Sequence, residues 1–340
     1  MGLMFRKIRV FQKILLISFL QSLILLSCTK TEKYYSFIIV PDTQYLSYSY
    51  PQVFKKEMNW IVKNKELLNI QYVFHMGDIT DQNQEFEWKV ADSCLKKIEV
   101  ANIPYSLVYG DNDIKNPYRF YDRYDGIRHT ELLNKYFPQS RFEKHGSSGN
   151  FIFYEPGKID NSYSQFRYDG DKYIILNLEI APRDRVLRWA DSVINHNVSR
   201  KVIIITHDYI DADGKRLDDL KSFGMEGKDS TGVPRGNDAN EIFKRLIKDN
   251  FNVFMLLCGH KTGDCVNTIK TKASGDSGKK RRFFEILTDY QNVSLDGSRE
   301  GNGNGLIRIM KIYPAKNKIV LSSVCTLNGK HYGKKVTLSF

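Results

Sequence analysis

The sequence has no internal repeat and no long low-complexity linker, so neither a repeat array nor a string of tethered domains is expected. Cysteines are few, and the five present are spaced neither as a disulfide framework nor as a paired zinc site. Cys94 falls on a predicted helix and Cys258 ends an apolar strand, so we expect buried thiols at both. Cys265 is a weak candidate metal ligand, because no second cysteine accompanies it.

Long apolar runs are missing too, apart from one near the N-terminus, Ile14 to Leu26, which follows a basic start. This run is shorter than the ~20 residues of a spanning helix. The order of basic, apolar and small residues instead predicts a signal peptide over residues 1–27. Leu25-Leu26-Ser27-Cys28 resembles a bacterial lipobox, which predicts lipidation of Cys28. The alternatives are an uncleaved anchor or a plain signal peptide.

In either case we expect an exported protein, and with a lipid on Cys28 a membrane-anchored lipoprotein of the periplasm or cell surface. Acidic residues are in the minority, and the formal charge is +12. Without residues 1–27, which hold four basic residues and no acid, the charge is +8. A basic chain favours anionic partners without distinguishing phosphate esters from nucleic acid or lipid headgroups. No specific nucleic-acid motif is present. Residues 29–340 have the length of one large domain.

Strand and helix patterns alternate in the first half. Residues 52–69 and 85–100 have apolar side chains at three-and-four spacing, which indicates helices that connect parallel strands. Between about residues 150 and 180, Pro-Gly and Asp-Gly turns separate short strands, which is typical of antiparallel pairing. The other predicted elements are helices at 131–136, 183–197 and 239–249, polar loops at 211–237 and 271–282, and strands at 283–287, 306–313, 319–324 and 335–340. We predict an α/β fold of two packed mixed β-sheets flanked by helices.

Five predicted strands end in residues that commonly bind metals. The sequences at these ends are Pro41-Asp42-Thr43-Gln44, Gly77-Asp78-Ile79-Thr80-Asp81, Gly110-Asp111-Asn112-Asp113, Thr206-His207-Asp208 and Gly259-His260. In open α/β sheets the carboxyl ends of the strands border one crevice, so these side chains should converge there.

The order of these motifs resembles the calcineurin-like metallophosphoesterase superfamily from Asp42 to about Arg308. More narrowly, Pro-Asp-Thr-Gln, Asp289-Tyr290-Gln291 and the glycine-rich stretch 301–308 are similar to a bacterial branch of it. The resemblance implies a hydrolase of phosphomonoesters or phosphodiesters, with one or two divalent ions (Mn, Mg, Fe or Zn). In such sites the nucleophile is a hydroxide that bridges two ions about 3.5–4 Å apart.

The resemblance also implies a ligand set. Asp78 would bridge the two metals, and the second metal would be bound by Asp78, Asp111, His207 and His260. The first metal would be bound by Asp42 and Asp78.

Two departures from the family pattern affect the first metal. Gln44 stands where a histidine is common, and Thr262 replaces the second histidine of a G-H-x-H motif. With Gln44 and Thr262 as candidate ligands, the first metal has an oxygen set that suits Mg²⁺, Mn²⁺ or Ca²⁺ better than zinc.

A third departure concerns catalysis. The family reads G-N-H-D or G-N-H-E where this chain has Asp111 and Asn112. That histidine protonates the leaving oxygen and is steadied by the second acid of G-D-x-x-D, here Asp81. Asparagine does not donate a proton near neutral pH, and losing a general acid costs roughly 10²–10⁴-fold in rate. We expect Asn112 to hydrogen-bond Asp81 and the phosphate instead.

The remaining candidates each have a plainer alternative. Arg183, at a predicted helix start, is either a phosphate clamp or a surface arginine. His75 lies within a strand and is expected to be a satisfied core histidine. The loop at 211–237 is a flap over the site or an insertion. Lys261 could place a cation where the first metal would lie. The basic end of the 271–282 loop is expected to be solvated.

Two functions are therefore compatible with the sequence. One is a metal-dependent phosphoesterase, weakened at Asn112. The other is an impaired descendant that binds a phosphorylated or polyanionic ligand without turnover.

Overall fold

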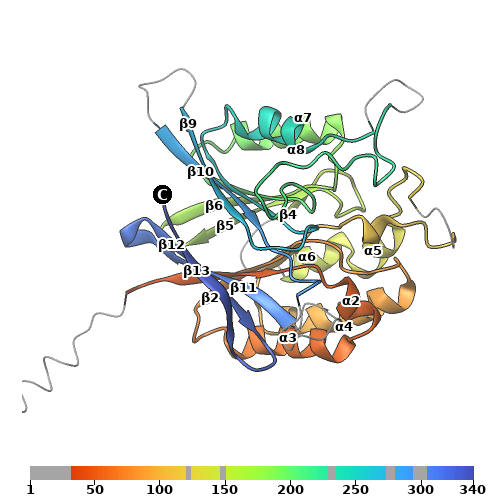
Figure 1. Cartoon of the computed structure of the whole chain (residues 1–340), viewed down its shortest axis with the longest axis horizontal. Coiled ribbons are helices and arrows are strands. Elements are labelled where there is room, and N and C mark those ends of the chain that lie inside the picture. Colours follow the sequence, from red (N-terminus) through yellow and green to blue (C-terminus); the bar gives the residue numbers. More distant parts are fainter. Residues whose placement is uncertain (1–31, 120–123, 146–150, 229–234, 273–279, 294–304) are drawn as a thin grey trace, which may run out of the picture. The chain divides into compact units, whose positions relative to one another are not determined.

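Two β-sheets carry the fold, and helices cover their outer faces (Figure 1). The computed structural model describes residues 32–119, 124–145, 151–228, 235–272, 280–293 and 305–340. The predicted signal peptide, Cys28 and residues 301–304 of the glycine-rich motif lie outside these ranges. The unit described below is Tyr35–Phe340.

The first sheet has the strand order β13-β12-β11-β1-β2-β3. Its strands are β1 (Tyr35–Val40), β2 (Ile70–His75), β3 (Tyr105–Leu107), β11 (Leu306–Tyr313), β12 (Lys318–Cys325) and β13 (His331–Ser339). β1, β2 and β3 are parallel. β11 pairs antiparallel with β1, and β12 and β13 continue in the antiparallel sense.

The second sheet has the order β4-β5-β6-β7-β8-β10-β9. Its strands are β4 (Phe151–Phe153), β5 (Ser162–Tyr168), β6 (Asp171–Asn177), β7 (Lys201–Ile205), β8 (Val253–Cys258), β9 (Val266–Lys272) and β10 (Lys280–Leu287). The central strands β6, β7, β8 and β10 are parallel, and the strands at both edges are antiparallel. Both sheets are mixed, which confirms the predicted fold class.

Three apolar layers hold the unit together. The sheets meet over an aromatic-rich core that includes Phe37, Phe74 and Phe166. A second core joins the first sheet to α3 and α4, and a third joins the second sheet to α7 and α8. The helices are α2 (Gln44–Tyr48), α3 (Pro51–Lys63), α4 (Glu85–Val100), α5 (Glu131–Tyr136), α6 (Gln139–His145), α7 (Asp184–Asn195), α8 (Ala239–Ile242), the 3₁₀ turns η1 (Asn112–Ile114) and η4 (Pro314–Lys316), and the π-helical η2 (Phe243–Ile247). None of the helices in the described residues is long and apolar enough to cross a bilayer.

Two predicted elements differ from the structure. The helix predicted to reach residue 69 ends at Lys63, because the side chain of Asn64 bonds the carbonyl oxygen of Trp60 at 2.8 Å and Asn69 adopts a left-handed φ of 48°. The polar loop predicted at 271–282 is wrong at both ends, since β9 extends to Lys272, and residues 273–279 lie outside the described ranges. Residues 280–282 begin β10, and the Arg281 guanidinium donates to the carbonyl oxygen of Val253 at 2.6 Å.

The predictions for Cys94 and Cys258 are confirmed, because both are buried free thiols. Among the described residues, Cys265 joins no group of potential metal ligands. His75 is buried as expected and lies 3.0 Å from the Thr43 hydroxyl.

Glu57, on the inner face of α3, leads to a prediction about stability. The residue is 1 % exposed and its Oε1 has no hydrogen-bond partner. Burial raises its pKa from 4.5 to about 8. Between these pH values the folded protein retains a proton that the unfolded chain has released, so stability falls as pH rises across this window. We predict that Glu57→Gln reduces the fall by on the order of 4 kcal/mol.

Urea denaturation at pH 4, 6 and 8 measures this effect. Glu131→Gln, at an exposed position on α5, is the matched control and should retain the wild-type pH dependence. An unchanged slope in Glu57→Gln would show that this carboxyl group is not the source of the pH dependence.

Candidate metal centre

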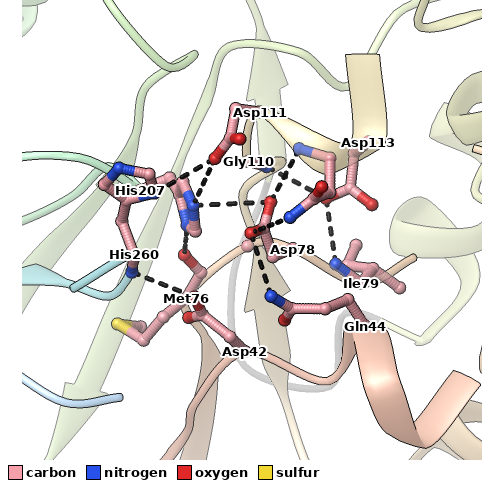
Figure 2. A network of polar contacts seen from close by, with 12 residues as sticks. Asp42, Gln44, Met76, Asp78, Ile79, Gly110, Asp111, Asp113, His207 and His260 are labelled. Atoms are coloured by element: carbon pink, nitrogen blue, oxygen red, sulfur yellow. Dashed lines mark hydrogen bonds and ion pairs between the residues drawn. The ribbon is translucent and has the colours of Figure 1, made fainter. Parts of the chain in front are cut away.

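The five strand ends singled out in the sequence meet at one edge of the two sheets. Asp42, Asp78 and Asp111 follow β1, β2 and β3, and His207 and His260 follow β7 and β8. Figure 2 shows these side chains pointing toward a common space. The parallel strands thus deliver polar side chains where their apolar runs stop.

Asp78, Asp111, His207 and His260 form the centre of the cluster, with one potential ligand atom from each within 4.8 Å of the others. His207 Nε2 lies 3.4 Å from Asp78 Oδ1 and 3.3 Å from Asp111 Oδ1. His260 Nδ1 lies 3.1 Å from Asp111 Oδ1. Yet the buried His207 Nε2 and Asp111 Oδ1 have no hydrogen-bond partner. Buried polar atoms that converge without hydrogen bonds fit a shared divalent cation.

The orientation of His207 supports this arrangement. Its Nδ1 lies 2.8 Å from the carbonyl oxygen of Met76, which accepts only, so Nδ1 carries the hydrogen. Nε2 is then the nitrogen left to bind a metal ion beside Asp78 and Asp111. A backbone carbonyl that fixes one imidazole nitrogen is typical support for a metal-binding histidine.

The carboxylates around His207 and His260 also favour positive charge on these imidazoles or between them. Burial alone would lower the pKa of His207, but Asp78 and Asp42 outweigh it and raise that pKa well above the usual value. Burial also acts to lower the pKa of His260, but Asp111 and Asp219 outweigh it and raise that pKa to about 10. Without a metal, protons on the imidazoles supply the charge that the carboxylates require.

A second group of oxygens lies beside this cluster. Burial and the charge of Asp289 raise the pKa of Asp42 well above its usual value. Burial, with Asp78 contributing, raises the pKa of Asp289 to about 7. Asp42 Oδ1 and Gln44 Oε1 are buried without hydrogen-bond partners. Crowded acids with unpaired oxygens fit a second cation, and the donor set is oxygen-rich.

Two glycines allow the backbone to pass this close. A Cβ on Gly110 would lie 2.1 Å from Asp78 Oδ1 and 2.6 Å from His207 Nε2. A Cβ on Gly259 would lie 2.2 Å from Asp42 Oδ1. Asp78 and His260 themselves adopt positive φ angles of 45° and 70°. Strained backbone of this kind costs roughly 1–3 kcal/mol per residue and is concentrated at functional sites.

Asn112 contacts a different acid from the one expected. Its backbone N–H donates to Asp78 Oδ1 at 2.9 Å, and its side-chain amide donates to Asp78 Oδ2 at 2.6 Å. The Asp81 carboxylate instead accepts from Gln82. The predicted Asn112–Asp81 hydrogen bond is therefore corrected to an Asn112–Asp78 pair, because η1 begins at Asn112 and directs its donors at Asp78.

Gln44 and Thr262 contact different members of the oxygen group. The Gln44 amide donates to Asp78 Oδ2 at 3.4 Å and to Gln291 Oε1. The Thr262 hydroxyl donates to Asp289 Oδ2 at 3.4 Å. Gln44 thus contacts the shared ligand candidate Asp78 directly. Thr262 contacts the oxygen group only by donating to Asp289.

Arg183 and Lys261 are each engaged by a carboxylate. Arg183 donates to Glu179 through Nε at 2.8 Å and Nη2 at 2.7 Å, an arrangement that anchors the start of α7. This geometry disagrees with the predicted phosphate clamp, because the fork that would bind phosphate faces Glu179. Lys261 pairs with Asp219 at 2.6 Å.

Several residues near the centre received no role from the sequence. Asp113 accepts from the backbone N–H groups of Ile79, Thr80 and Gly110, and so joins two of the motif loops. Its place as the fourth residue of Gly-Asp-Asn-Asp was the available signal. Asp289 was recognised only as part of a motif.

Three loop residues contact the histidine and aspartate ligand candidates. Tyr124 donates its hydroxyl to Asp111 Oδ2 at 2.8 Å. Asp219, from the 211–237 loop, lies 3.6 Å from His260 Nε2, and Phe223 of the same loop packs edge-on against the His260 ring. The described part of this loop therefore reaches the site, and no sequence motif marked either contact.

Comparison with known proteins agrees with this geometry. Residues 35–262 match the calcineurin-like phosphoesterases, and the chain belongs to that family. The family implies divalent metal ions, in agreement with the cluster of Asp78, Asp111, His207 and His260.

Two known proteins are similar to this chain. The uncharacterized protein YvnB of Bacillus subtilis (strain 168) is 30% identical over 293 residues, which are 85% of this chain and 20% of that protein. The chain therefore spans about a fifth of this relative's length. A purple acid phosphatase from yellow lupin seeds has a similar fold, with a TM-score of 0.53 and 14% identity over 91% of this chain and 54% of that one.

The Tyr124 contact yields a prediction for metal binding. Because the phenol covers Asp111 Oδ2, Oδ1 alone faces the two histidines. Removing such a supporting hydrogen bond typically costs 10–100-fold in metal affinity. We expect Tyr124→Phe to weaken Mn²⁺ binding by roughly 10-fold or more, measured by isothermal titration calorimetry. Tyr118→Phe, at a position that is 94% exposed, should bind like the wild type. If the wild type, Tyr124→Phe and Tyr118→Phe bind Mn²⁺ with equal affinity, Tyr124 does not support the metal ligands.

Proposed function

We propose that this protein hydrolyses phosphomonoesters or phosphodiesters with divalent ions held between the strand ends. One observation carries the proposal. Ligand atoms of Asp78, Asp111, His207 and His260 lie within 4.8 Å, and two of these buried atoms, His207 Nε2 and Asp111 Oδ1, have no hydrogen-bond partner. Divalent ions in such a site supply Lewis acidity and lower the pKa of bound water.

The residues divide into two ligand sets that share Asp78. One set comprises Asp78, Asp111, His207 Nε2 and His260 Nδ1, a mixture that accepts Mn²⁺, Fe²⁺ or Zn²⁺. The other comprises Asp42, Gln44 and Asp78, with Asp289 in place of Thr262. This all-oxygen set suits Mg²⁺ or Mn²⁺.

Membership of the Pro-Asp-Thr-Gln branch is part of the proposal. Gln44, from the first motif of that branch, hydrogen-bonds Gln291 from Asp289-Tyr290-Gln291. Gln291 in turn donates to the carbonyl oxygen of His260 at 3.2 Å. The two motifs that define the resemblance thus meet at one side of the oxygen set, which supports a shared role for them.

Asn112 acts as a positioning group for the shared carboxylate. With two donors on Asp78, it fixes the plane of that carboxylate. It supplies no proton to a leaving oxygen, because an amide does not ionise near neutral pH. Hydrolysis is therefore expected to favour esters whose leaving groups need no protonation.

The alternative of a ligand-binding descendant without turnover rested partly on Lys261. If Lys261 replaced the first metal, its ammonium group would face Asp42. It pairs instead with Asp219, a residue of the 211–237 loop. The oxygens Asp42 Oδ1 and Gln44 Oε1 thus remain without a partner, which supports a metal ion rather than a lysine at the first metal position.

We also propose that the protein is exported and tethered to a membrane by a lipid on Cys28. The support is the sequence alone: basic residues, an apolar run from Ile14 to Leu26, and Leu-Leu-Ser-Cys. Metabolic labelling with a fatty acid, compared between wild type and Cys28→Ser, tests this proposal.

Asp78→Ala tests the catalytic proposal. Because Asp78 belongs to both ligand sets, its loss should abolish turnover of an aryl phosphate and an aryl phosphodiester in Mn²⁺, measured by release of the phenol. Asp213→Asn, at an exposed loop position, is the control and should retain activity. Turnover that persists in Asp78→Ala would reject the site. Metal binding by the wild type without turnover of either ester would support the binding alternative.

Asn112→His tests the missing proton donor. We expect kcat for an alkyl phosphate, a poor leaving group, to rise by up to roughly 10²-fold. The rate for an activated aryl ester should change little, because its leaving group needs no proton. Asn112→Gln keeps an amide at this position and should not show the leaving-group-dependent gain. A uniform change for both substrates would mean that proton donation does not limit the reaction.

A further inference from the structure

The edge of the sheets opposite the metal centre contains a separate feature. β7 begins there at Lys201, β8 at Val253, and β10 pairs alongside β8. A cavity of about 230 Å³ opens between these strand starts and the two loops that precede β7 and β8. It is lined by Val198, Ser199, Arg200, Lys201, Phe251, Asn252, Val253, Phe254 and Arg282.

The rim of this cavity combines exposed apolar and cationic side chains. Val198 is 54% exposed and Phe251 is 59% exposed. Arg200 donates through Nη2 to Gln165 at 2.9 Å, but its Nη1 is buried and has no hydrogen-bond partner. Arg282 is exposed and uses Nη1 on the carbonyl oxygen of Ser339 at 2.5 Å. Guanidinium groups that line a cavity open to the surface, as those of Arg200 and Arg282 do, pair readily with an anionic oxygen such as that of a phosphate.

The same edge is basic beyond the cavity. Around the strand starts and hairpin turns lie Arg167, Lys172, Lys248, Arg281, Lys316 and Lys318, against Asp169, Asp171, Asp191 and Asp249. Lys201 is already neutralised by Asp171 at 2.7 Å. The surplus of cations around two exposed apolar side chains complements an anionic bilayer surface, where lipid phosphates lie next to acyl chains.

The start of β1 links this edge to the N-terminal segment. Tyr35 donates to Asp171 Oδ2 at 2.7 Å, and Asp171 Oδ1 binds the cavity residue Lys201 at 2.7 Å. The chain therefore enters the unit beside the cavity. Six residues lie between Cys28 and Tyr35, and even fully extended the chain from one to the other spans no more than about 25 Å. A lipid on Cys28 would keep this edge within that distance of the bilayer.

We propose that this edge docks on the anionic surface of the membrane. Phe251 and Val198 insert at headgroup level, and Arg200 and Arg282 bind lipid phosphates. The metal centre, at the opposite edge, then faces the aqueous side. This inference rests on the proposed lipid anchor and is independent of the proposed hydrolysis.

Hydrogen–deuterium exchange of the full-length protein in vesicles tests the docking. Backbone amides at 198–201 and 251–254 should exchange more slowly in vesicles that contain phosphatidylglycerol than in phosphatidylcholine alone. Each cation near an anionic surface contributes about a fivefold effect, so Arg200→Gln with Arg282→Gln should lower the docked-to-undocked ratio roughly 25-fold. Phe251→Ser should also reduce the protection. The pair Lys89→Gln and Lys96→Gln, exposed on α4, is the matched control and should keep it.

Three outcomes would overturn the proposal: no protection in either vesicle, equal protection in both, or the same protection from inorganic phosphate without vesicles. The last outcome would identify a soluble anion site instead. Thermal unfolding of each variant shows whether lost protection reflects misfolding. The exchange experiment does not depend on catalysis. A negative result therefore says nothing against the phosphoesterase proposal, and docking can be tested even if the protein proves to be inactive.

Discussion

The site depends on the concentration of negative charge at a buried edge. Asp42, Asp78, Asp111 and Asp289 are all at most 7 % exposed. Buried carboxylates repel one another and lose hydration, so the folded state must supply positive charge among them. Protonated imidazoles meet part of that need when no metal is present. Divalent ions meet it fully, and this makes metal binding a source of stability as well as of chemistry.

The two-sheet architecture tolerates this charge because the rest of the unit is strongly apolar. Three cores pack the strands on both faces, and the side chains of β1, β7 and β8 are almost all hydrophobic. Polar groups therefore concentrate where the strands end. There, Gly110 and Gly259 let neighbouring loops approach, and Asp78 and His260 accept left-handed backbone angles. Packing elsewhere offsets the strain of these few positions.

Much of this arrangement was predictable from the sequence, for physical reasons. Apolar runs of strand length, broken by metal-binding side chains, indicated both the sheets and the convergence of Asp42, Asp78, Asp111, His207 and His260. What could not be predicted depends on tertiary approach. Contacts from Tyr124 and Asp219 come from loops whose paths no local pattern sets. The arginines of the 271–282 segment suggested a solvated loop, yet Arg281 donates to backbone oxygens of the neighbouring strand β8 and helix η2. Asn112 turned to Asp78 because of the backbone geometry of η1, which sequence spacing does not reveal.

The departures from the family pattern are electrostatically consistent with one another. Replacing a neutral amide by the Asp111 carboxylate adds negative charge to the ligand set, which strengthens metal binding but leaves each ion a weaker Lewis acid. Tyr124 moderates that charge by donating to the oxygen that faces away from the histidines. With Asn112 the site also lacks a proton donor for the leaving oxygen. The changes at Asp111 and Asn112 preserve the cation site and reduce the assistance given to the leaving group. They therefore support the proposal of substrates that are intrinsically easy to cleave, rather than loss of the metal centre.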